Sequence, residues 1–439
     1  VDLLAQIPNN RSVGFRFGCM DGQNTPSPRA YAEILNGVSP KGHFMSMSTS
    51  VGMVFTTEDP QLPKALFDPN MGGANRFSRY LMTGFVNYLE DYPYPYVIGN
   101  KILELPFVYP NDYTGQALYG AQNPIMIADY KAAVDATVAK RGAVSLCFHA
   151  GEWMRNDQMV EVVDHADHTH GKKVKFLNMP ELHDLMVKNL LGGHPLRDEN
   201  GEDNGVRLLD LNADGYMDVV IGNANAKLTR IWDPSTSTWK ESSFPWRIDG
   251  NVRFGIFDES GLAGMIAVHE AAVMGWRFDG QEWIYEKSLG RSEKIAPQTN
   301  GADGGARLLD LNGDGICELV VGMTGHSVAF ERSEDGWKKL PFALPEGTAI
   351  VTNDGADAGL RFADLDQDGN LDIIHSDGDS FSTWLFASME EGWSKQGVSG
   401  TRENEEHSRD RRVIPAIVRK DGTNNGAWIK RGHLYWQNE

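Results

Sequence analysis

Three stretches of the chain share one pattern: DLNADGYMD (Asp210–Asp218), DLNGDGICE (Asp310–Glu318) and DLDQDGNLD (Asp364–Asp372). Each has an acid at positions 1, 5 and 9, an Asn or Asp at position 3, and a glycine at position 6. Side-chain oxygens at this spacing form the all-oxygen ligand set that Ca2+ prefers. The glycine gives the backbone the freedom to wrap around an ion. The pattern therefore predicts three calcium-binding loops.

The expected ligands are the side chains at positions 1, 3, 5 and 9 and the main-chain carbonyl at position 7. In chain order they are Asp210, Asn212, Asp214, Tyr216, Asp218, Asp310, Asn312, Asp314, Ile316, Glu318, Asp364, Asp366, Asp368, Asn370 and Asp372. We expect the ions to be structural, because each would hold together a loop whose clustered carboxylates otherwise repel one another.

The residues around the loops predict β-hairpin turns and exclude an EF-hand. An EF-hand loop has a Glu at position 12 and lies between two helices. At position 12 this chain has Ile221, Val321 and His375. Short apolar runs typical of buried strands come directly before and after each loop. Each ion is therefore expected to join two strands at their ends.

The loops belong to a longer repeat. Units begin near Val206, Val252, Ala306, Leu360 and Arg412. A period of roughly fifty residues is within the range of propeller blades. Spaced aromatic residues after each inner hairpin predict an outer hairpin, with turns at Asp279-Gly280 and Asp335-Gly336.

Residues 200–439 resemble the FG-GAP or VCBS repeat family, which has the same acidic loops. The resemblance implies a calcium-binding β-propeller like that of integrin α-chains. Propellers of this family usually have seven blades, and five units are recognisable here. The resemblance therefore implies that further chain, or another subunit, completes the propeller.

Two units depart from the pattern. In the second, loop positions 1, 3, 5, 6 and 9 are Ile256, Asp258, Ser260, Gly261 and Gly264, so we expect a blade without calcium. In the fifth, the sequence predicts a strand at Val413–Val418 and a turn at Asp421-Gly422.

Composition limits the partners and the cellular environment. The 439-residue chain has a formal net charge of −19 and no basic tract, which argues against nucleic acid and anionic membranes as partners. No apolar run is long enough to span a membrane. Calcium loops of moderate affinity suit millimolar extracellular calcium, so we expect a secreted, periplasmic or cell-surface protein. Val1-Asp2-Leu3-Leu4 is typical of the end of a helix, and we expect residues upstream of it.

Residues 1–195 predict an α/β domain in which strands and helices alternate. Predicted strands cover residues 13–17, 143–149 and 173–177, and predicted helices cover residues 28–35, 125–139, 156–168 and 180–190. In such folds, active sites lie at the carboxyl ends of the strands. Arg16, Asp21 and His149 lie at or just after such ends and are the candidate catalytic residues.

This half resembles the polysaccharide deacetylase (NodB-homology) family. Arg16-Phe17-Gly18 is similar to the family's Arg-x-Pro motif, and Leu146-Cys147-Phe148-His149 is similar to its Leu…His motif. The resemblance implies a partial (β/α)-barrel that removes acetyl groups from a glycan, with Arg16 orienting a catalytic acid and His149 as general acid. From the residues alone, a structural ion pair between Arg16 and Asp21 is an alternative of at least equal weight, and His149 can equally cap the end of its strand by hydrogen bonding.

The family's metal-binding residues do not occur in this chain. The paired Asp-Asp and the His-x-x-x-His motif should precede Arg16, where only fifteen residues stand and none is a His. The ligands of a catalytic divalent metal would therefore lie outside this chain. The alternative function is a non-catalytic carbohydrate-binding or adhesion scaffold, or a subunit of a larger extracellular assembly.

One histidine-rich segment predicts a surface helix end rather than a metal site. Asp164–His170 contains three histidines directly before Gly171. Cationic side chains at the end of a helix complement its dipole. His165 and His168 share a face, but the sequence indicates no buried third ligand beside them.

Overall fold

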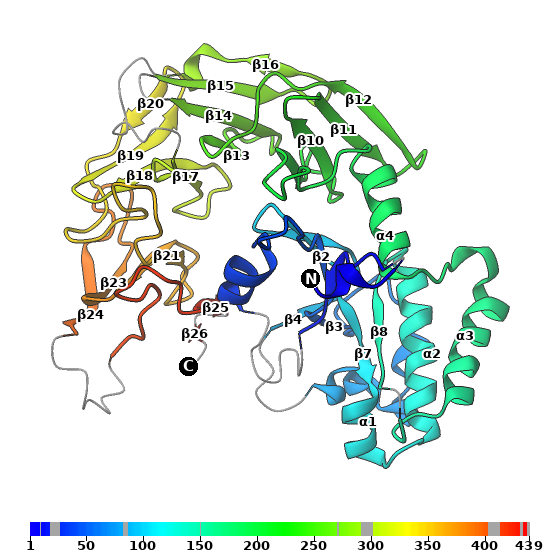
Figure 1. Ribbon diagram of the computed structural model, residues 1–439. Coiled ribbons are helices and arrows are strands. Elements are labelled where there is room, and N and C mark those ends of the chain that lie inside the picture. The colour runs from blue at the N-terminus through cyan, green and yellow to red at the C-terminus, as the bar shows by residue number, and fades with distance from the viewer. Residues whose placement is uncertain are drawn as a thin grey trace. The chain divides into compact units, whose positions relative to one another are not determined.

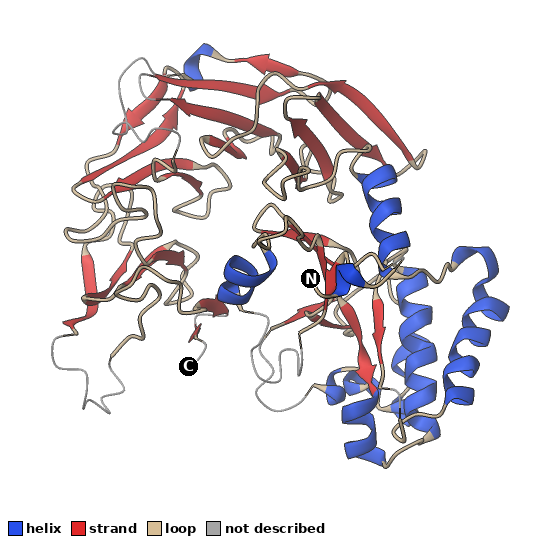
Figure 2. Ribbon diagram, viewed as in Figure 1, coloured by secondary structure: helices blue, strands red, loops and turns tan. Residues whose placement is uncertain are grey.

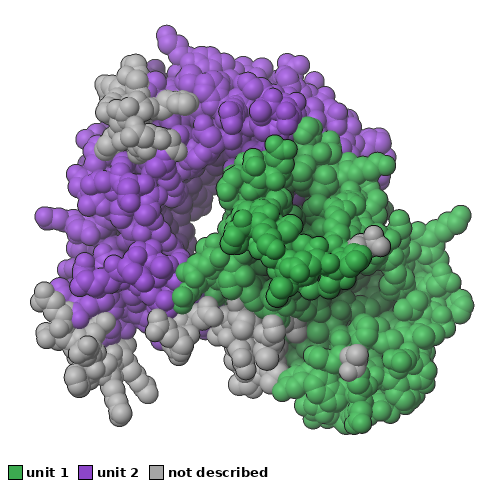
Figure 3. Space-filling view, in the orientation of Figure 1, with its two compact units in different colours: residues 1–203 green, residues 204–439 purple. Residues whose placement is uncertain are grey.

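The chain forms two compact units, Val1–Asp203 and Asn204–Glu439 (Figure 3, green and purple). The structure is a computed structural model. It describes residues 1–8, 10–17, 27–81, 87–149, 151–269, 272–290, 302–402, 413–430 and 433–436.

The first unit contains two four-stranded sheets. In spatial order, the first sheet consists of β1 (Gly14–Phe15), β2 (Met47–Ser48), β6 (Ile102–Glu104) and β5 (Tyr96–Ile98), with β5 antiparallel to β6. The second sheet is parallel throughout and consists of β4 (Tyr88–Glu90), β3 (Gly52–Val54), β7 (Phe107–Asn111) and β8 (Ser145–Cys147).

The α-helices of the first unit come late in its chain. α1 (Asp112–Tyr119) and α2 (Pro124–Ala139) lie between β7 and β8, and α3 (Asn156–His170) and α4 (Met179–Leu185) come after β8; all four are blue in Figure 2. Asn178 caps α4: its side chain accepts from the Glu181 N–H, and the Glu181 side chain accepts from the Asn178 N–H. Apolar residues of α2 and α3 share one core with β3 and β7 (Met53, Phe107, Tyr130, Val162 and Ala166).

The described strands of this unit form two separate sheets rather than one continuous barrel sheet. Between the edge strands β1 and β8 the contact comes from a side chain: Arg16, next to β1, donates to the hydroxyl of Ser145 in β8 at 2.6 Å.

The predicted strand at residues 173–177 is wrong. A short 3-10 turn, Gly171–Lys173, follows α3, and residues 174–177 are not in a strand. Lys175 and Phe176 are exposed, and no strand among the described residues pairs with the segment. Alternation of charged and apolar residues produces a strand only where one face is buried.

The second unit contains four consecutive four-stranded antiparallel sheets, in agreement with the predicted inner and outer hairpins (Figure 1). Their strands are β9 (Val206–Leu209), β10 (Asp218–Gly222), β11 (Lys227–Asp233) and β12 (Thr238–Ser243); β13 (Val252–Ile256), β14 (Ala263–His269), β15 (Ala272–Phe278) and β16 (Trp283–Tyr285); β17 (Ala306–Leu309), β18 (Glu318–Met323), β19 (His326–Ser333) and β20 (Gly336–Lys339); and β21 (Leu360–Ala363), β22 (Asp372–Ser376), β23 (Ser380–Leu385) and β24 (Lys395–Thr401).

Each sheet packs against the next through a buried apolar layer. Val220 of the first sheet and Met265 of the second lie in one cluster, and Ile266 lies in a cluster with Leu319 of the third. Val320 and Ile373 lie in the cluster between the third and fourth sheets. Full burial of such a side chain stabilises the fold by about 1.5–3 kcal/mol, so these layers hold the row of sheets together.

The last part of the chain differs from the prediction. The unit start near Arg412 lies outside the described residues. Val413–Val418 does not form the predicted strand, because Pro415 lacks an N–H and the Ser376 hydroxyl donates to the Pro415 carbonyl. The residues at Asp421-Gly422 do form a turn, and a two-stranded sheet of β25 (Trp428–Lys430) and β26 (His433–Tyr435) follows.

Candidate functional site

The three acidic loops occupy the same position in three of the four sheets. Each joins the two inner strands, and its ninth residue pairs with the residue before the loop: Asp218 with Leu209, Glu318 with Leu309, and Asp372 with Ala363. The glycine at position 6 has a φ of 83–94° in all three, a conformation that side-chain-bearing residues rarely adopt. The predicted hairpin turns are thus confirmed.

In each loop, the carboxylates accept hydrogen bonds from backbone N–H groups of the same loop. In the first loop, Asp210 accepts from the backbone N–H groups of Asp214 and Gly215 at 3.2 and 2.9 Å, and Asp214 accepts from Tyr216 N–H at 2.9 Å. Equivalent bonds from positions 5 and 6 to position 1, and from position 7 to position 5, recur in the second and third loops. The acids therefore lie on the concave side of a tight turn.

The acid at position 9 joins the loop to the sheet. Asp218 accepts from Leu211 N–H within its own loop at 3.0 Å and from Trp232 N–H on the next strand at 2.8 Å. Burial, together with the charges of Asp214 and Asp210, raises the pKa of the Asp218 carboxyl to about 6. The same causes raise the pKa of Glu318 to about 7, and burial raises that of Asp372.

The donor atoms in these loops fit a hard cation. In the third loop, carboxylate oxygens of Asp364, Asp366 and Asp372 all lie within 4.8 Å of one another. A raised pKa means that the folded protein destabilises the ionised form of the carboxyl group. A cation bound among the oxygens would stabilise that ionised form. All-oxygen donors are the preferred ligands of Ca2+.

The hairpin of the second sheet has the same length but no such cage. Gly255 pairs with Gly264, which corresponds to the pair of Leu209 and Asp218 in the first sheet. The ladder continues for one more pair, Ile256 with Ala263, where the other hairpins begin their loops. In this hairpin Ile256 and Gly264 thus occupy positions 1 and 9, which are acids in the other three loops.

Neighbouring turns contact one another in a row. Ala263 N–H of the second hairpin donates to the Leu211 carbonyl of the first loop at 2.9 Å. Cys317 N–H of the next loop donates to the Ile256 carbonyl at 2.8 Å, and Leu371 N–H donates to the Leu311 carbonyl at 3.0 Å. The four hairpin ends therefore form one connected series.

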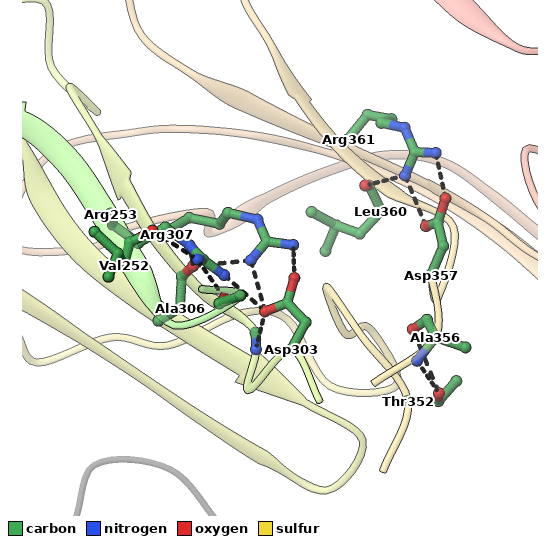
Figure 4. A network of polar contacts seen from close by, with 12 residues as sticks. Val252, Arg253, Asp303, Ala306, Arg307, Thr352, Ala356, Asp357, Leu360 and Arg361 are labelled. Atoms are coloured by element: carbon green, nitrogen blue, oxygen red, sulfur yellow. Dashed lines mark hydrogen bonds and ion pairs between the residues drawn. The ribbon is translucent and has the colours of Figure 1, made fainter. Parts of the chain in front are cut away.

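An arginine–aspartate network links the starts of the inner strands (Figure 4). Arg307 binds Asp303 with both terminal nitrogens, and Arg361 binds Asp357 in the same way. Arg253 of the preceding sheet also donates to Asp303, at 2.9 Å. Asp303, Arg307, Asp357 and Arg361 line a pocket of about 360 Å³. The bond between Arg253 and Asp303 connects the second sheet to the third.

A second pocket lies on the fourth sheet and combines aromatic residues with polar groups, one of which is the carboxylate of Glu346. Its volume is about 300 Å³, and its lining includes Trp384, Gln396, Ser399, Thr348 and His375. The Trp384 indole is partly exposed, and its N–H donates to the Ser382 hydroxyl at 3.1 Å. Rings beside amide and hydroxyl groups are suited to stacking on a sugar and bonding its hydroxyls.

In the first unit, the predicted residue His149 is held by an acid that the sequence analysis did not identify. Asp112 is completely buried and lies 2.8 Å from His149 Nδ1, and it also accepts from the His149 backbone N–H at 2.5 Å. Opposite an ionised carboxylate, Nδ1 is the donor, so Nε2 is left to take up or release a proton. The imidazole is half exposed, at 52%.

The parallel register explains why Asp112 and His149 meet. Asn111 of β7 pairs with Cys147 of β8, so the residues just after the two strands lie at one sheet edge. The ring centroid of Trp153 lies 4.8 Å from that of His149 and 5.3 Å from that of Tyr113. Aromatic side chains therefore surround part of the imidazole at this edge of the sheet.

The other two candidate catalytic residues have different surroundings. Arg16 donates to the Thr49 carbonyl and hydroxyl and to the Ser145 hydroxyl, at 2.6–2.8 Å, and its catalytic role stays a prediction. Asp21 lies outside the described residues, so its predicted role and its pairing with Arg16 remain predictions.

Comparison with known proteins supports the repeat region. An FG-GAP-like repeat model matches residues 278–375, from the end of β15 through most of β22. No curated protein matches the chain. Within the described residues, we find no helix with the length and apolar character needed to cross a membrane.

Two solved structures are among those similar to the chain. One is an Agrocybe aegerita lectin that recognises non-reducing terminal N-acetylglucosamine, with 16% identity and a TM-score of 0.32 over 44% of this chain. The other is the Photorhabdus luminescens Tc holotoxin pore, with 19% identity and a TM-score of 0.32 over 46% of this chain. The chain spans half the length of the lectin chain and a tenth of that of the toxin chain.

Proposed function

We propose that this chain is a glycan-binding scaffold whose repeats are blades of a calcium-stabilised β-propeller. The observation that carries the binding role is the pocket beside Trp384, where an indole, an amide and hydroxyls converge. The FG-GAP-like match over residues 278–375 supports the repeat architecture. Other protein subunits are further candidate partners of such a scaffold.

Calcium occupancy is part of this proposal. The ligands would be the carboxylates and Asn side chains of the three acidic loops and the carbonyls of Tyr216, Ile316 and Asn370. Moderate-affinity loops of this kind suit millimolar calcium, so we propose that the protein acts outside the cytoplasm.

Replacement of Trp384 by Ala is expected to abolish glycan binding. Stacking on an aromatic ring contributes much of the affinity of a sugar site, and no other side chain of this pocket offers a comparable exposed ring. The measurement is binding of the full chain to an immobilised glycan array, followed by calorimetry with the best ligand.

Trp239→Ala is the matched control, because Trp239 is a partly exposed indole on an outer strand of the first sheet. It should leave binding unchanged. Glycan binding that survives Trp384→Ala, or that is equally lost in both variants, would remove the pocket from the proposal.

A second candidate function is hydrolysis of acetyl groups on a glycan, and the His149–Asp112 pair is the observation that favours it. Asp112 would orient the imidazole, and Nε2 would give a proton to the departing sugar oxygen or nitrogen as water attacks the acetyl carbonyl. No group of three metal-ligating side chains among the described residues includes His149, so we assign no step to a metal there.

Under this second candidate, acetate release from N-acetylated chitooligosaccharides or O-acetylated xylan should fall in His149→Ala by about 10²–10⁴-fold, the usual contribution of a general acid. His168→Ala, on the exposed side of α3, is the control and should retain full activity. If acetate release is absent, or is equal in the two variants, the hydrolytic function is contradicted and glycan binding remains the proposed function.

A further inference from the structure

Three metal-ligating side chains converge between two helices of the first unit. His165 and His170 lie on α3, and each presents Nε2 to the same oxygen, Oδ1, of Asp135 on α2. The two distances are 2.8 and 2.7 Å. All three donor atoms lie within 4.8 Å of one another. The sequence placed His165 and His168 on one face; in the structure His170, not His168, joins His165, and Asp135 on the neighbouring helix is the third side chain.

The two helices are fixed relative to each other around this cluster. One helical turn earlier, Lys131 of α2 forms an ion pair with Glu161 of α3. Val162 and Ala166 of α3 are completely buried in the core that includes Ala132 and Ala136 of α2. The parts of the two helices that carry the three side chains are therefore held next to each other by packing.

We propose that Asp135, His165 and His170 bind a divalent transition metal ion of the zinc class, which clips α2 to α3. Imidazole nitrogens and a carboxylate oxygen are ordinary Zn2+ ligands. At the usual metal–ligand distance of about 2.0–2.1 Å, tetrahedral donors are about 3.3 Å apart, so small side-chain rotations would open the cluster around an ion. The proposal is independent of the proposed glycan site.

A fourth ligand position is available to water. The side chains of His165, His170 and Asp135 are 23%, 16% and 32% exposed, so the cluster is partly shielded but reaches solvent. Three protein ligands with one open position are typical of a site that holds a water or an exchangeable ligand.

The hydrogen bond on the second ring nitrogen of His165 also suits a role as a metal ligand. His165 Nδ1 lies 3.4 Å from the Thr169 hydroxyl, one turn further along α3. A hydrogen bond on the second ring nitrogen fixes the orientation of a metal-bound imidazole and leaves Nε2 for the ion. A helix-dipole cap requires neither this contact nor the convergence of both rings on one oxygen.

The site is distinct from His149 and from the acidic loops. His170 is the last residue of α3, fourteen residues after its start at Asn156, or about 20 Å along the helix at 1.5 Å per residue. The acidic loops offer oxygen donors only, whereas this cluster offers two nitrogens. A metal ion that prefers nitrogen ligands will therefore bind this cluster more tightly than the acidic loops.

The test is a Co2+ titration of the untagged full chain in excess Ca2+, followed by visible absorption, with Zn2+ added afterwards as competitor. We expect one Co2+ per chain with a nitrogen-ligated spectrum that Zn2+ removes. His165→Ala and His170→Ala should each weaken binding by more than the roughly 10–100-fold that loss of an outer-shell partner costs.

His168→Ala is the matched control, since it removes an exposed imidazole from the same helix and should bind Co2+ like the unmodified chain. Asp135→Asn removes the charge with little change in volume, and it should weaken binding with the helices intact by circular dichroism. The absence of a saturable Co2+ band, or unchanged affinity in His165→Ala, His170→Ala and Asp135→Asn, would overturn the proposal.

Discussion

Removal of calcium with EGTA is expected to lower the melting temperature of the Asn204–Glu439 unit. Without the ion, each acidic loop holds three or four carboxylates close together at the end of a hairpin. An ion that binds only the folded loop stabilises the unit by about 2.7 kcal/mol when its concentration is a hundred times its Kd. Calorimetry of the full chain with and without EGTA measures the effect.

Single-loop variants show whether the effect arises in the acidic loops. Asp364→Asn removes a charge from the carboxylate cluster of the third loop and should lower calcium affinity. Asp258→Asn makes the same chemical change in the hairpin of the second sheet, which lacks acids at positions 1 and 9, and should have no effect on calcium binding. An EGTA-insensitive melting temperature would contradict the calcium proposal.

The stabilisation by calcium should also increase with pH. Carboxylates bind the ion in their ionised form, and the pKa values of Asp218 and Glu318 are raised to about 6 and about 7. Without the ion, these raised values favour the folded state at low pH and the contribution is lost as the pH rises through them. The difference in melting temperature with and without calcium should therefore be larger at pH 8 than at pH 5.

Replacement of Asp129 by Ala is expected to destabilise the first unit strongly. Asp129 is completely buried and accepts hydrogen bonds from Arg76 at 2.6 Å, from Tyr80 at 2.7 Å and from Arg79. Its removal leaves the guanidinium of Arg76, itself buried, without its carboxylate. Loss of one partner of a buried ion pair costs about 3–5 kcal/mol.

Hydrogen exchange of the α2 peptides in the full chain measures this cost without interference from the second unit. Asp157→Ala is the control, because Asp157 pairs with Arg155 on the surface and both side chains are at least half exposed. It should leave exchange in α2 unchanged. Equal protection in Asp129→Ala and Asp157→Ala would show that the buried network does not stabilise α2.

The repeat region is the part of the fold that the sequence predicts best. The acidic loop motif is enough to predict a turn, because it places a glycine at the position that needs a positive φ. Gly215, Gly315 and Gly369 all have this conformation, which residues with a side chain rarely adopt. The apolar runs on either side can then pair only as a hairpin. The segment Val413–Val418 has the same apolar character, but Pro415 prevents a regular ladder.

The first unit is harder to predict from sequence because its strands are short. β1 and β2 have two residues each, and β3 and β6 have three, so no alternation can be recognised. β7 contains Pro110, which argues against a strand in a sequence-based assignment. This strand is therefore not predicted from the sequence, and neither is Asp112 as the partner of His149.

The partners of the histidines depend on tertiary contacts. The sequence shows His165 and His170 on one helix, but Asp135 lies thirty residues earlier on a different helix. Only the packing of α2 against α3 shows that the three meet. A regular helix pattern predicts each helix separately and carries no information on which turns face each other.

The extra pair of Ile256 and Ala263 has a consequence for how the unit assembles. The turn of the second hairpin is held by its own side chains, because Asp258 Oδ1 accepts from the Ser260 N–H and the Ser260 hydroxyl accepts from the Leu262 N–H. Its backbone also bonds to the acidic loops on both sides. If those loops bind calcium as we propose, we expect the second hairpin to form without the ion and the calcium concentration to control when the two adjoining turns close.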